Sequence, residues 1–253
     1  MRIKRAVVAA AAVLALGSVT GCGGDGDDTK AAAQPTTSPS TERLESMTGT
    51  VILDRAHGEF LKAASVKLTG TVADKGRTTA TFTVSVKASG GCTGFVELGG
   101  DGRAELLRAS GQTLVKPSSK ALAEYFGLAT AEFRADRWIR LAKSESVASV
   151  TSGMCDLKAV PVFGDGDWSK MVNSDGTKTV NGRKVVSVFT STPEEGAYFG
   201  YVATDGAARP ARIESFQSEG HDIGLTVDFS DYDAPVNVTL PPADQITDPA
   251  AAQ

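Results

Sequence analysis

The chain of 253 residues has few of the residues on which catalytic sites are usually built. It contains only two histidines and three cysteines. No serine has a glycine two positions away on both sides, as in a hydrolase nucleophile elbow, and none lies three positions before a lysine, as in acylating serine enzymes. His57 and His221 fall in an expected surface helix and a turn, where a solvated side chain is the default. The sequence therefore predicts no enzyme and no catalytic residue.

The acidic and glycine-rich segments also lack the spacing of a ligand site. Asp165–Asp167 resembles a fragment of a calcium loop, but the remaining ligands and the closing glutamate are missing. Glu194–Glu195 and Asp231–Asp233 supply carboxylates that nothing brings together. Gly90–Gly91 and Gly99–Gly100 are not followed by helical patterns, as a phosphate-binding loop would be. We expect no metal and no cofactor.

The chain has no excess of positive charge. Residues 1–21 contain three basic and no acidic residues, so the rest of the chain has 23 Lys and Arg against 30 Asp and Glu. Proteins that bind nucleic acid usually gather basic residues to neutralise phosphates. Nucleic acid is therefore excluded as an expected partner. After residue 21, no apolar segment is long enough to span a membrane.

The one long apolar run lies at the N-terminus. Basic residues within the first five positions precede the apolar segment 6–16, which is typical of a secretory signal and too short for a mature transmembrane helix. The sequence V-T-G-C at 19–22 resembles the lipobox of bacterial lipoproteins, in which the cysteine is acylated before the peptidase cuts in front of it. We expect 1–21 to be a signal peptide and Cys22 to anchor the chain to the extracytoplasmic side of the cell membrane. Plain secretion with a chance cysteine is the alternative.

The rest of the chain divides by composition. Residues 22–43 are rich in Gly and Asp and then in Ala, Thr, Ser and Pro, which is typical of a flexible linker. Residues 44–248 form one expected domain, since about 200 residues are enough to bury a sizeable core. Residues 249–253 are a short polar tail.

Two cysteines remain once Cys22 is assigned to the lipid. In an exported protein, an even number of cysteines favours a disulfide, here between Cys92 and Cys155. Closing a loop of this length should stabilise the fold by about 4 kcal/mol. Two free thiols or a shared metal are the alternatives, but neither histidine lies near either cysteine in the sequence.

Apolar residues alternate with polar ones over most of the domain. One amphipathic helix is expected over 50–64, a short helix over 118–126, and another helix carrying Val147, Val150, Met154, Cys155 and Leu157. Asn181-Gly182 is the strongest hairpin signal. Strands are expected at 65–74, 77–87, 94–98, 103–109, 112–116, 136–142, 178–180, 183–191, 196–204, 209–217 and 222–230. The pattern predicts an α+β domain whose helices pack on one face of a long antiparallel sheet of roughly ten strands.

Such a sheet, covered by a few helices, encloses an apolar volume. Side chains can fill that volume, or part of it can stay open for acyl chains. Small residues at strand positions favour some open space; they are Gly94, Ala104, Gly200 and Ala203.

A series of segments, taken in order, resembles the LppX/LprG group of actinobacterial envelope lipoproteins within the LolA/LolB-like superfamily. The segments are 63–66, 112–116, 136–139, 180–186, 200–203, 208–213, 229–236 and 241–243. The resemblance implies a long curved sheet, a half-open barrel, wrapped around a few helices. It also implies a hydrophobic cavity that carries lipid or lipoglycan acyl chains across the envelope, an envelope transporter as a partner, and no catalytic residues.

Candidate lipid contacts follow from the alternation rather than from a motif. They are Val66, Leu68, Phe82, Val84, Val96, Leu98, Val147, Val150, Met154 and Leu157. Each of them also suits an ordinary core. A lipoprotein of the same fold with a filled core, acting as a sensor or as a module that binds a protein partner, is therefore the alternative function.

Overall fold

The computed structural model describes most of the expected domain. The described residues are 43–126, 128, 133–135, 137–141, 154–160, 172–192, 196–216 and 223–248. The chain divides into two units, Met1–Ser40 and Thr41–Gln253, and every described residue belongs to the second. The predictions for the signal peptide, Cys22, Val147 and Val150 lie outside the described residues.

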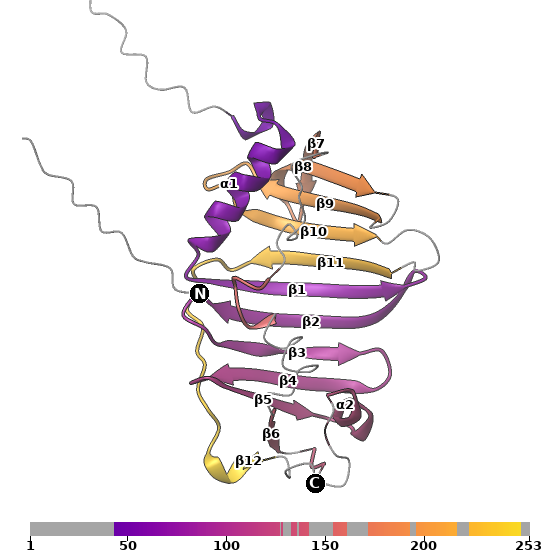
Figure 1. The fold of residues 1–253 in the computed structure, drawn as a ribbon, viewed down its shortest axis with the longest axis vertical. Helices are drawn as coiled ribbons and strands as arrows, with labels where there is room; N and C mark the ends of the chain where they lie inside the picture. The colour runs from indigo at the N-terminus through magenta and orange to yellow at the C-terminus, as the bar shows by residue number, and fades with distance from the viewer. Residues whose placement is uncertain are drawn as a thin grey trace, which may run out of the picture. The chain divides into compact units, whose positions relative to one another are not determined.

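Twelve strands form one sheet (Figure 1). They are β1 (Ser65–Asp74), β2 (Arg77–Lys87), β3 (Cys92–Leu98), β4 (Gly102–Ala109), β5 (Gln112–Pro117), β6 (Trp138–Arg140), β7 (Asn173–Val180), β8 (Arg183–Thr192), β9 (Gly196–Ala203), β10 (Pro210–Phe216), β11 (Ile223–Ser230) and β12 (Ile246–Thr247). Their order across the sheet is β12-β6-β5-β4-β3-β2-β1-β11-β10-β9-β8-β7. The long, mostly antiparallel sheet predicted from the alternation is confirmed, with one strand, β12, beyond the eleven expected segments.

The sheet consists of two meanders that meet in the middle. Strands β1–β5 and β7–β11 each follow chain order, and β1 pairs with β11 along its length. Tight turns make this order possible. Both Lys75-Gly76 and Asn181-Gly182 have positive φ at the two central positions, at 48° and 74° and at 49° and 76°. This is the conformation of a type I′ turn, whose twist matches that of the two strands it joins.

The helical content of the described residues is small. Helix α1 (Gly49–Leu61) follows a short 3₁₀ turn, η1 (Leu44–Ser46), and α2 (Lys120–Tyr125) follows β5. Helix α2 falls within the range predicted from the sequence, and α1 begins one residue before its predicted range and ends three residues before that range ends. The Ser119 hydroxyl caps α2 by accepting a hydrogen bond from the Leu122 N–H at 3.2 Å, which satisfies one of the free donors of the first turn.

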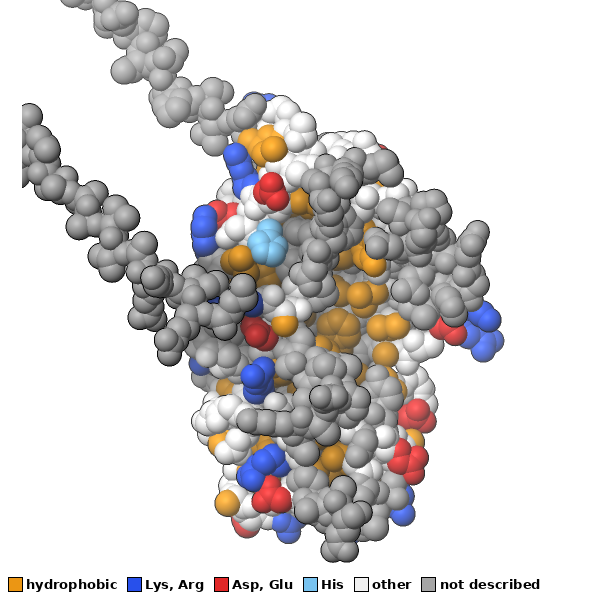
Figure 2. Space-filling view, viewed as in Figure 1, with side chains coloured by type: hydrophobic (Ala, Val, Ile, Leu, Met, Phe, Trp, Pro, Cys, Tyr) orange, Lys and Arg blue, Asp and Glu red, His pale blue; other side chains and the backbone are white. Residues whose placement is uncertain are grey.

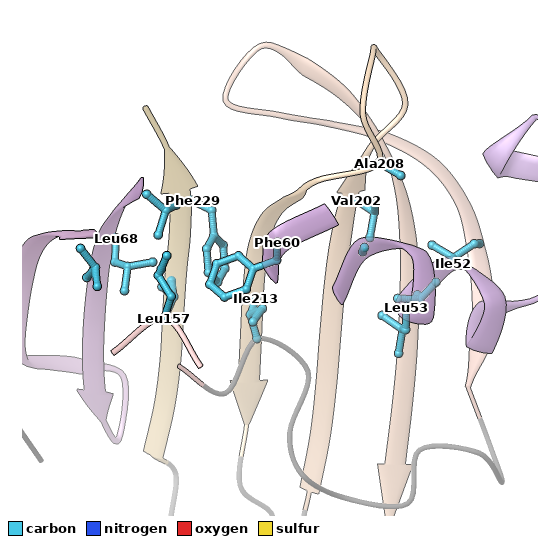
Figure 3. Packing of buried hydrophobic residues seen from close by; sticks show 14 of the residues in the cluster. Ile52, Leu53, Phe60, Leu68, Leu157, Val202, Ala208, Ile213 and Phe229 are labelled. Carbon is cyan, nitrogen blue, oxygen red and sulfur yellow. The ribbon is translucent and has the colours of Figure 1, made fainter. Parts of the chain in front are cut away.

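Helix α1 packs its apolar stripe on one face of the sheet, which we call the inner face. Ile52, Ala56 and Phe60 are fully buried in one cluster with side chains from β8–β11 and from β1–β4. The Phe60 ring meets the Phe229 ring edge to face, with centroids 5.8 Å apart (Figure 3). One continuous core therefore crosses the boundary between the two meanders.

A second, small core lies over β4 and β5, near the edge of the sheet formed by β6 and β12. Leu122 of α2 and Phe126, the residue after the helix, pack on Ala104 of β4 and Val115 of β5. A further strand that the sequence analysis did not predict closes this edge. Ile246 of β12 pairs in parallel with Trp138 of β6. A strand of two residues is too short to produce a visible alternation.

One prediction about the middle of the chain is wrong. The helix expected to carry Cys155 and Leu157 does not extend that far, because residues 155–160 form turns. The Asp156 side chain accepts a hydrogen bond from the Lys158 N–H at 3.0 Å, and the Asp156 carbonyl accepts one from the Ala159 N–H at 2.9 Å. An aspartate that bonds to its own backbone in this way favours a turn over a helix.

Candidate functional site

Burial on the inner face falls from one end of the strands to the other. We call the end where β1 begins proximal and the end where it finishes distal. On β1, Val66 and Leu68 are 1% and 3% exposed, whereas Val72, on the same face, is half-buried. On β2 the order along the strand is reversed, and Val86 and Val84 are fully buried while Phe82 and Ala80 are half-buried. On β1 and β2 the inner face is therefore closed proximally and partly open distally, whereas α2 covers the distal ends of β4 and β5.

The half-buried apolar residues form a connected surface. We call this surface the distal face; it consists of Val72, Ala80, Phe82, Val96, Leu98, Tyr198 and Leu225. Ala80 lies opposite Leu98 and Phe82 opposite Val96, between β2 and β3. Val72 lies opposite Ala80 on one side and Leu225 on the other. Figure 2 shows hydrophobic side chains gathered at the surface on this side of the sheet, with charged side chains toward its edges.

Two parts of the chain cover the proximal end. Helix α1 lies over the β8–β11 half, and the segment 154–160 lies over β1–β3. Leu157, from this segment, points into the same group of side chains as Leu68 and Phe229 (Figure 3). The disulfide between Cys92 and Cys155, predicted from the sequence, fixes the segment to β3. Its position explains why burial is complete at this end.

Hydrogen bonds also hold the proximal corner shut. Asp233, which follows β11, accepts a hydrogen bond from the Ala64 N–H at 2.7 Å and forms an ion pair with Arg209 at 2.7 Å. The Asp233 N–H donates to the Ser65 carbonyl at 3.0 Å, and the Ser65 hydroxyl donates to the Ala234 carbonyl at 2.6 Å. The N–H of Ala64 and the ion pair with Arg209 lower the pKa of Asp233. These contacts join the end of α1 to the end of β11.

A pocket of about 440 Å³ lies at the distal ends of β2, β3 and β4. Ala80 and Leu98 of the distal face contribute to its lining, together with the polar side chains of Thr81, Glu97 and Arg103. Glu97 and Arg103 form an ion pair at 3.7 Å. Because Glu97 and Arg103 alternate along their strands with the inner-face residues Val96, Leu98 and Ala104, this ion pair lies on the outer face, and the pocket takes lining from both faces of the strand ends.

A larger pocket of about 970 Å³ has a different character. It lies between η1, α1 and the connection from β9 to β10, and charged residues make up half of its lining. Two ion pairs occupy the lining, Lys184 with Glu45 at 3.2 Å and Lys62 with Glu59 at 2.7 Å. A backbone hydrogen bond and the Lys184 ammonium lower the pKa of Glu45. This pocket does not suit an acyl chain.

The opposite, outer face carries a polar network over β9–β11. Arg212 donates to both carboxylate oxygens of Asp228, at 2.7 and 3.0 Å, and its Nη1 lies 3.4 Å from Glu214 Oε1. The Tyr201 hydroxyl donates to Glu214 at 2.9 Å. Burial, followed by this hydrogen bond, raises the pKa of Tyr201 to about 12. Because each charge is paired, the network serves the packing of this half of the sheet.

The candidate lipid contacts share one face, but not one environment. Val66, Leu68, Val84 and Leu157 belong to the closed core, and Met154 packs against it. Phe82, Val96 and Leu98 are half-buried and belong to the distal face. Val72, Ala80, Tyr198 and Leu225 were not among the candidates, although they continue the same alternation. Pairing the strands in register would have identified them.

The small residues do not open the space that the sequence suggested. A Cβ at Gly94 would lie 2.1 Å from the Thr83 carbonyl oxygen, so this glycine allows two backbones to approach closely. Ala104 is buried under α2. Ala203 is fully buried on the outer face, opposite Val185. The opening comes from the limited reach of the covering segments.

Other kinds of site were sought in the part of the chain that the structure describes. These residues include no group of three or more His, Cys, Asp or Glu side chains placed to hold a metal ion. None of their helices has the length and apolar character needed to cross a membrane.

Comparisons with known proteins give the fold a name. No protein-family model matches the chain, and no curated protein matches its sequence. The chain is similar to the lipoprotein LppX of Mycobacterium tuberculosis, with a TM-score of 0.53 and 12% identity, over 76% of this chain and 98% of LppX. It is also similar to LprF from Mycobacterium bovis, with a TM-score of 0.51 and 13% identity, over 76% of this chain and 96% of LprF. The LppX-like fold implied by the sequence resemblance is confirmed.

Proposed function

We propose that this chain is an envelope lipoprotein that holds the acyl chains of a lipid or lipoglycan against its distal face. The observation that carries the proposal is the fall in burial along the inner face. The same strands carry an apolar surface that is buried at the proximal end and half-exposed at the distal end. Such a surface is suited to receiving an extended apolar ligand.

The physical basis is the removal of methylene groups from water. Each buried CH₂ contributes about 0.8 kcal/mol, so a chain of a dozen carbons that is only partly covered still gains several kcal/mol. No nucleotide or metal is needed for such binding.

The expected lipid anchor at Cys22 complements this function. An acylated chain would stay at the membrane from which a carrier must collect its lipid, since two or more acyl chains give stable anchoring. The shared fold with the lipoprotein LppX supports this part of the proposal. Replacing Cys22 with Ala should prevent acylation, and mass spectrometry of the anchored protein should find the acyl chains on Cys22.

A matched pair of variants on one strand tests the binding face. Val72 and Thr71 are neighbours on β1 and are both half-buried, but they point to the inner and outer faces respectively. Val72→Asp places a carboxylate on the distal face and should weaken binding of a fluorescent fatty acid at least about tenfold, because a charge resists burial beside an acyl chain. Thr71→Asp should change the affinity for the same fatty acid less than about twofold.

The outcomes separate the alternatives. Equal affinities of the two variants would remove the distal face as the binding site. A wild-type protein that takes up no acyl probe, and releases no lipid on solvent extraction, would refute lipid binding and leave the binding of a protein partner as the function to test. Unfolding curves of both variants should show that each is folded.

A further inference from the structure

The distal end of the sheet also carries an exposed cluster of aromatic rings on the outer face. Phe216 is the last residue of β10 and is 49% exposed, the largest value among the exposed large hydrophobic residues of the described chain. Its ring meets that of Phe199 edge to face at 6.2 Å, and Phe199 stacks on Phe189 at 6.0 Å. We call these three residues the aromatic rim.

The aromatic rim lies directly beside the open part of the inner face. Ser215, one residue before Phe216, faces the opposite side and lies across from Leu225 on β11 and Tyr198 on β9, which are both members of the distal face. The same end of the strands thus presents apolar side chains on both faces.

The size and chemistry of the rim favour a bilayer over a protein as its partner. One half-exposed ring, backed by two others, offers far less than the roughly 800 Å² per partner of a stable protein interface. Phenylalanine at the edge of a folded domain can instead enter the boundary between headgroups and acyl chains without further structure. The rim is preorganised for this, because its ring contacts already hold Phe216 in place.

The charges near the distal end do not select an anionic surface. The exposed charged residues of the described distal turns and of α2 balance in sign; they are Lys75, Arg77, Arg103 and Lys120 against Asp74, Glu97, Asp101 and Glu124. Among these described residues no net charge favours an anionic surface, so the contact proposed here relies on apolar insertion. The chain between Cys22 and Arg43 can extend over about 70 Å, so an anchored domain can bring any of its sides to the bilayer.

We propose that the aromatic rim inserts Phe216 into the surface of a lipid bilayer and so brings the open end of the distal face against the membrane. This inference rests on the proposed function, because it gives the lipid a route of entry. It assigns Phe216 the role of a membrane contact, separate from the residues that hold the bound acyl chain.

The test uses the full acylated protein on phosphatidylcholine vesicles that contain brominated acyl chains. The bromines should quench the tryptophan fluorescence of Phe216→Trp more strongly than that of the wild-type protein, which reports the natural tryptophans alone. Val51→Trp and Leu61→Trp are matched controls, because Val51 and Leu61 are 45% and 47% exposed on α1; neither should be quenched. Anionic lipid should not strengthen the quenching of Phe216→Trp.

A second variant keeps this inference distinct from the proposed function. Phe216→Ser should leave the affinity for a fluorescent fatty acid unchanged and slow transfer of a labelled lipid between vesicles at least about fivefold, whereas Leu61→Ser should alter neither. Binding of the probe without quenching at position 216 would overturn the membrane contact alone. Quenching without any binding of the probe would overturn the lipid-binding function alone. A change of mass in Phe216→Ser, measured by light scattering, would assign the rim to a second copy of the chain instead.

Discussion

The Phe82 side chain lies across Gly70, its partner on the neighbouring strand. A Cβ placed on Gly70 would come within 2.0 Å of Cζ and 2.2 Å of Cε1 of the Phe82 ring. The ring thus fills the space that the glycine leaves, and it lies at the boundary between the closed core and the distal face. This pair defines where the closed part of the inner face ends.

Gly70→Ala should drive the Phe82 ring off β1. The ring is half-buried and can swing toward the distal face, so we expect a loss of about 1 kcal/mol in the free energy of unfolding together with weaker binding of an acyl probe. In a Phe82→Ala background, the same change should be neutral or stabilising, because the clash is absent. Urea unfolding of the four proteins measures this coupling. An identical effect of Gly70→Ala in both backgrounds would contradict the contact.

Removing the disulfide should loosen the proximal end. Replacing both Cys92 and Cys155 with Ala should lower the free energy of unfolding by about 4 kcal/mol, since the bond closes a separation of 63 residues. Denaturant unfolding with and without reductant checks the value. With reductant, the wild type should unfold at the same denaturant concentration as the double variant. If neither the reductant nor the double substitution shifts the unfolding midpoint, the bond contributes nothing to stability.

The outer-face network should make the protein sensitive to alkali. The pKa of Tyr201 is raised to about 12, above the value of about 10 in an unfolded chain. The folded state therefore holds this proton more tightly. The resulting stability is complete below about pH 10 and is lost as the pH rises through about 12. Burial also raises the pKa of Tyr232, so this residue acts in the same direction.

Tyr201→Phe isolates the contribution of one phenol. The substitution should lower the free energy of unfolding by about 1 kcal/mol at neutral pH, because the hydrogen bond to Glu214 is lost while Arg212 still pairs with that carboxylate. The variant should then lose less stability than the wild type between about pH 9 and pH 11.5. Thermal unfolding across this range provides the comparison, and parallel curves would refute the assignment to Tyr201.

The proximal corner should respond to acid in the opposite sense. The pKa of Asp233 is lowered by the Ala64 N–H and by Arg209, so its contribution is present above the pKa of an unfolded aspartate and falls away as the pH drops through the lower folded value. Asp233→Asn keeps an acceptor for Ala64 but loses the ion pair with Arg209. Its stability should depend less on pH than that of the wild type below about pH 4. Amide exchange at Ala64 reports the local effect.

Most of the strands could be predicted because their signals are local. Alternation sets the bounds of β1 and β2, and a glycine or asparagine that accepts positive φ sets each tight turn, as at Asn181-Gly182. Segments without such a signal were missed or misplaced. Strand β12 depends on a distant partner, and the turn at Asp156 depends on one side-chain hydrogen bond.

The candidate site could be predicted only as a face. Val66 and Val72 are the same residue type, on the same strand and the same face, yet one is buried and the other half-exposed. Among the described residues, α1 and the segment 154–160 pack in the same core as Val66, and Val72 does not belong to that core. No local pattern states how far a covering segment reaches, so the position of the opening required the structure.

The pairing of β1 with β11 carries a consequence for how the chain matures. Lys67 pairs with Ser85 of β2 within the first hairpin, but its partner on the other side is Ser230 of β11, so the first meander keeps an unpaired edge until β11 has been synthesised. An edge of this kind invites pairing with other chains. Completion of the central seam therefore requires β11, and a chain interrupted before residue 223 would keep this edge unpaired and open to pairing with other chains.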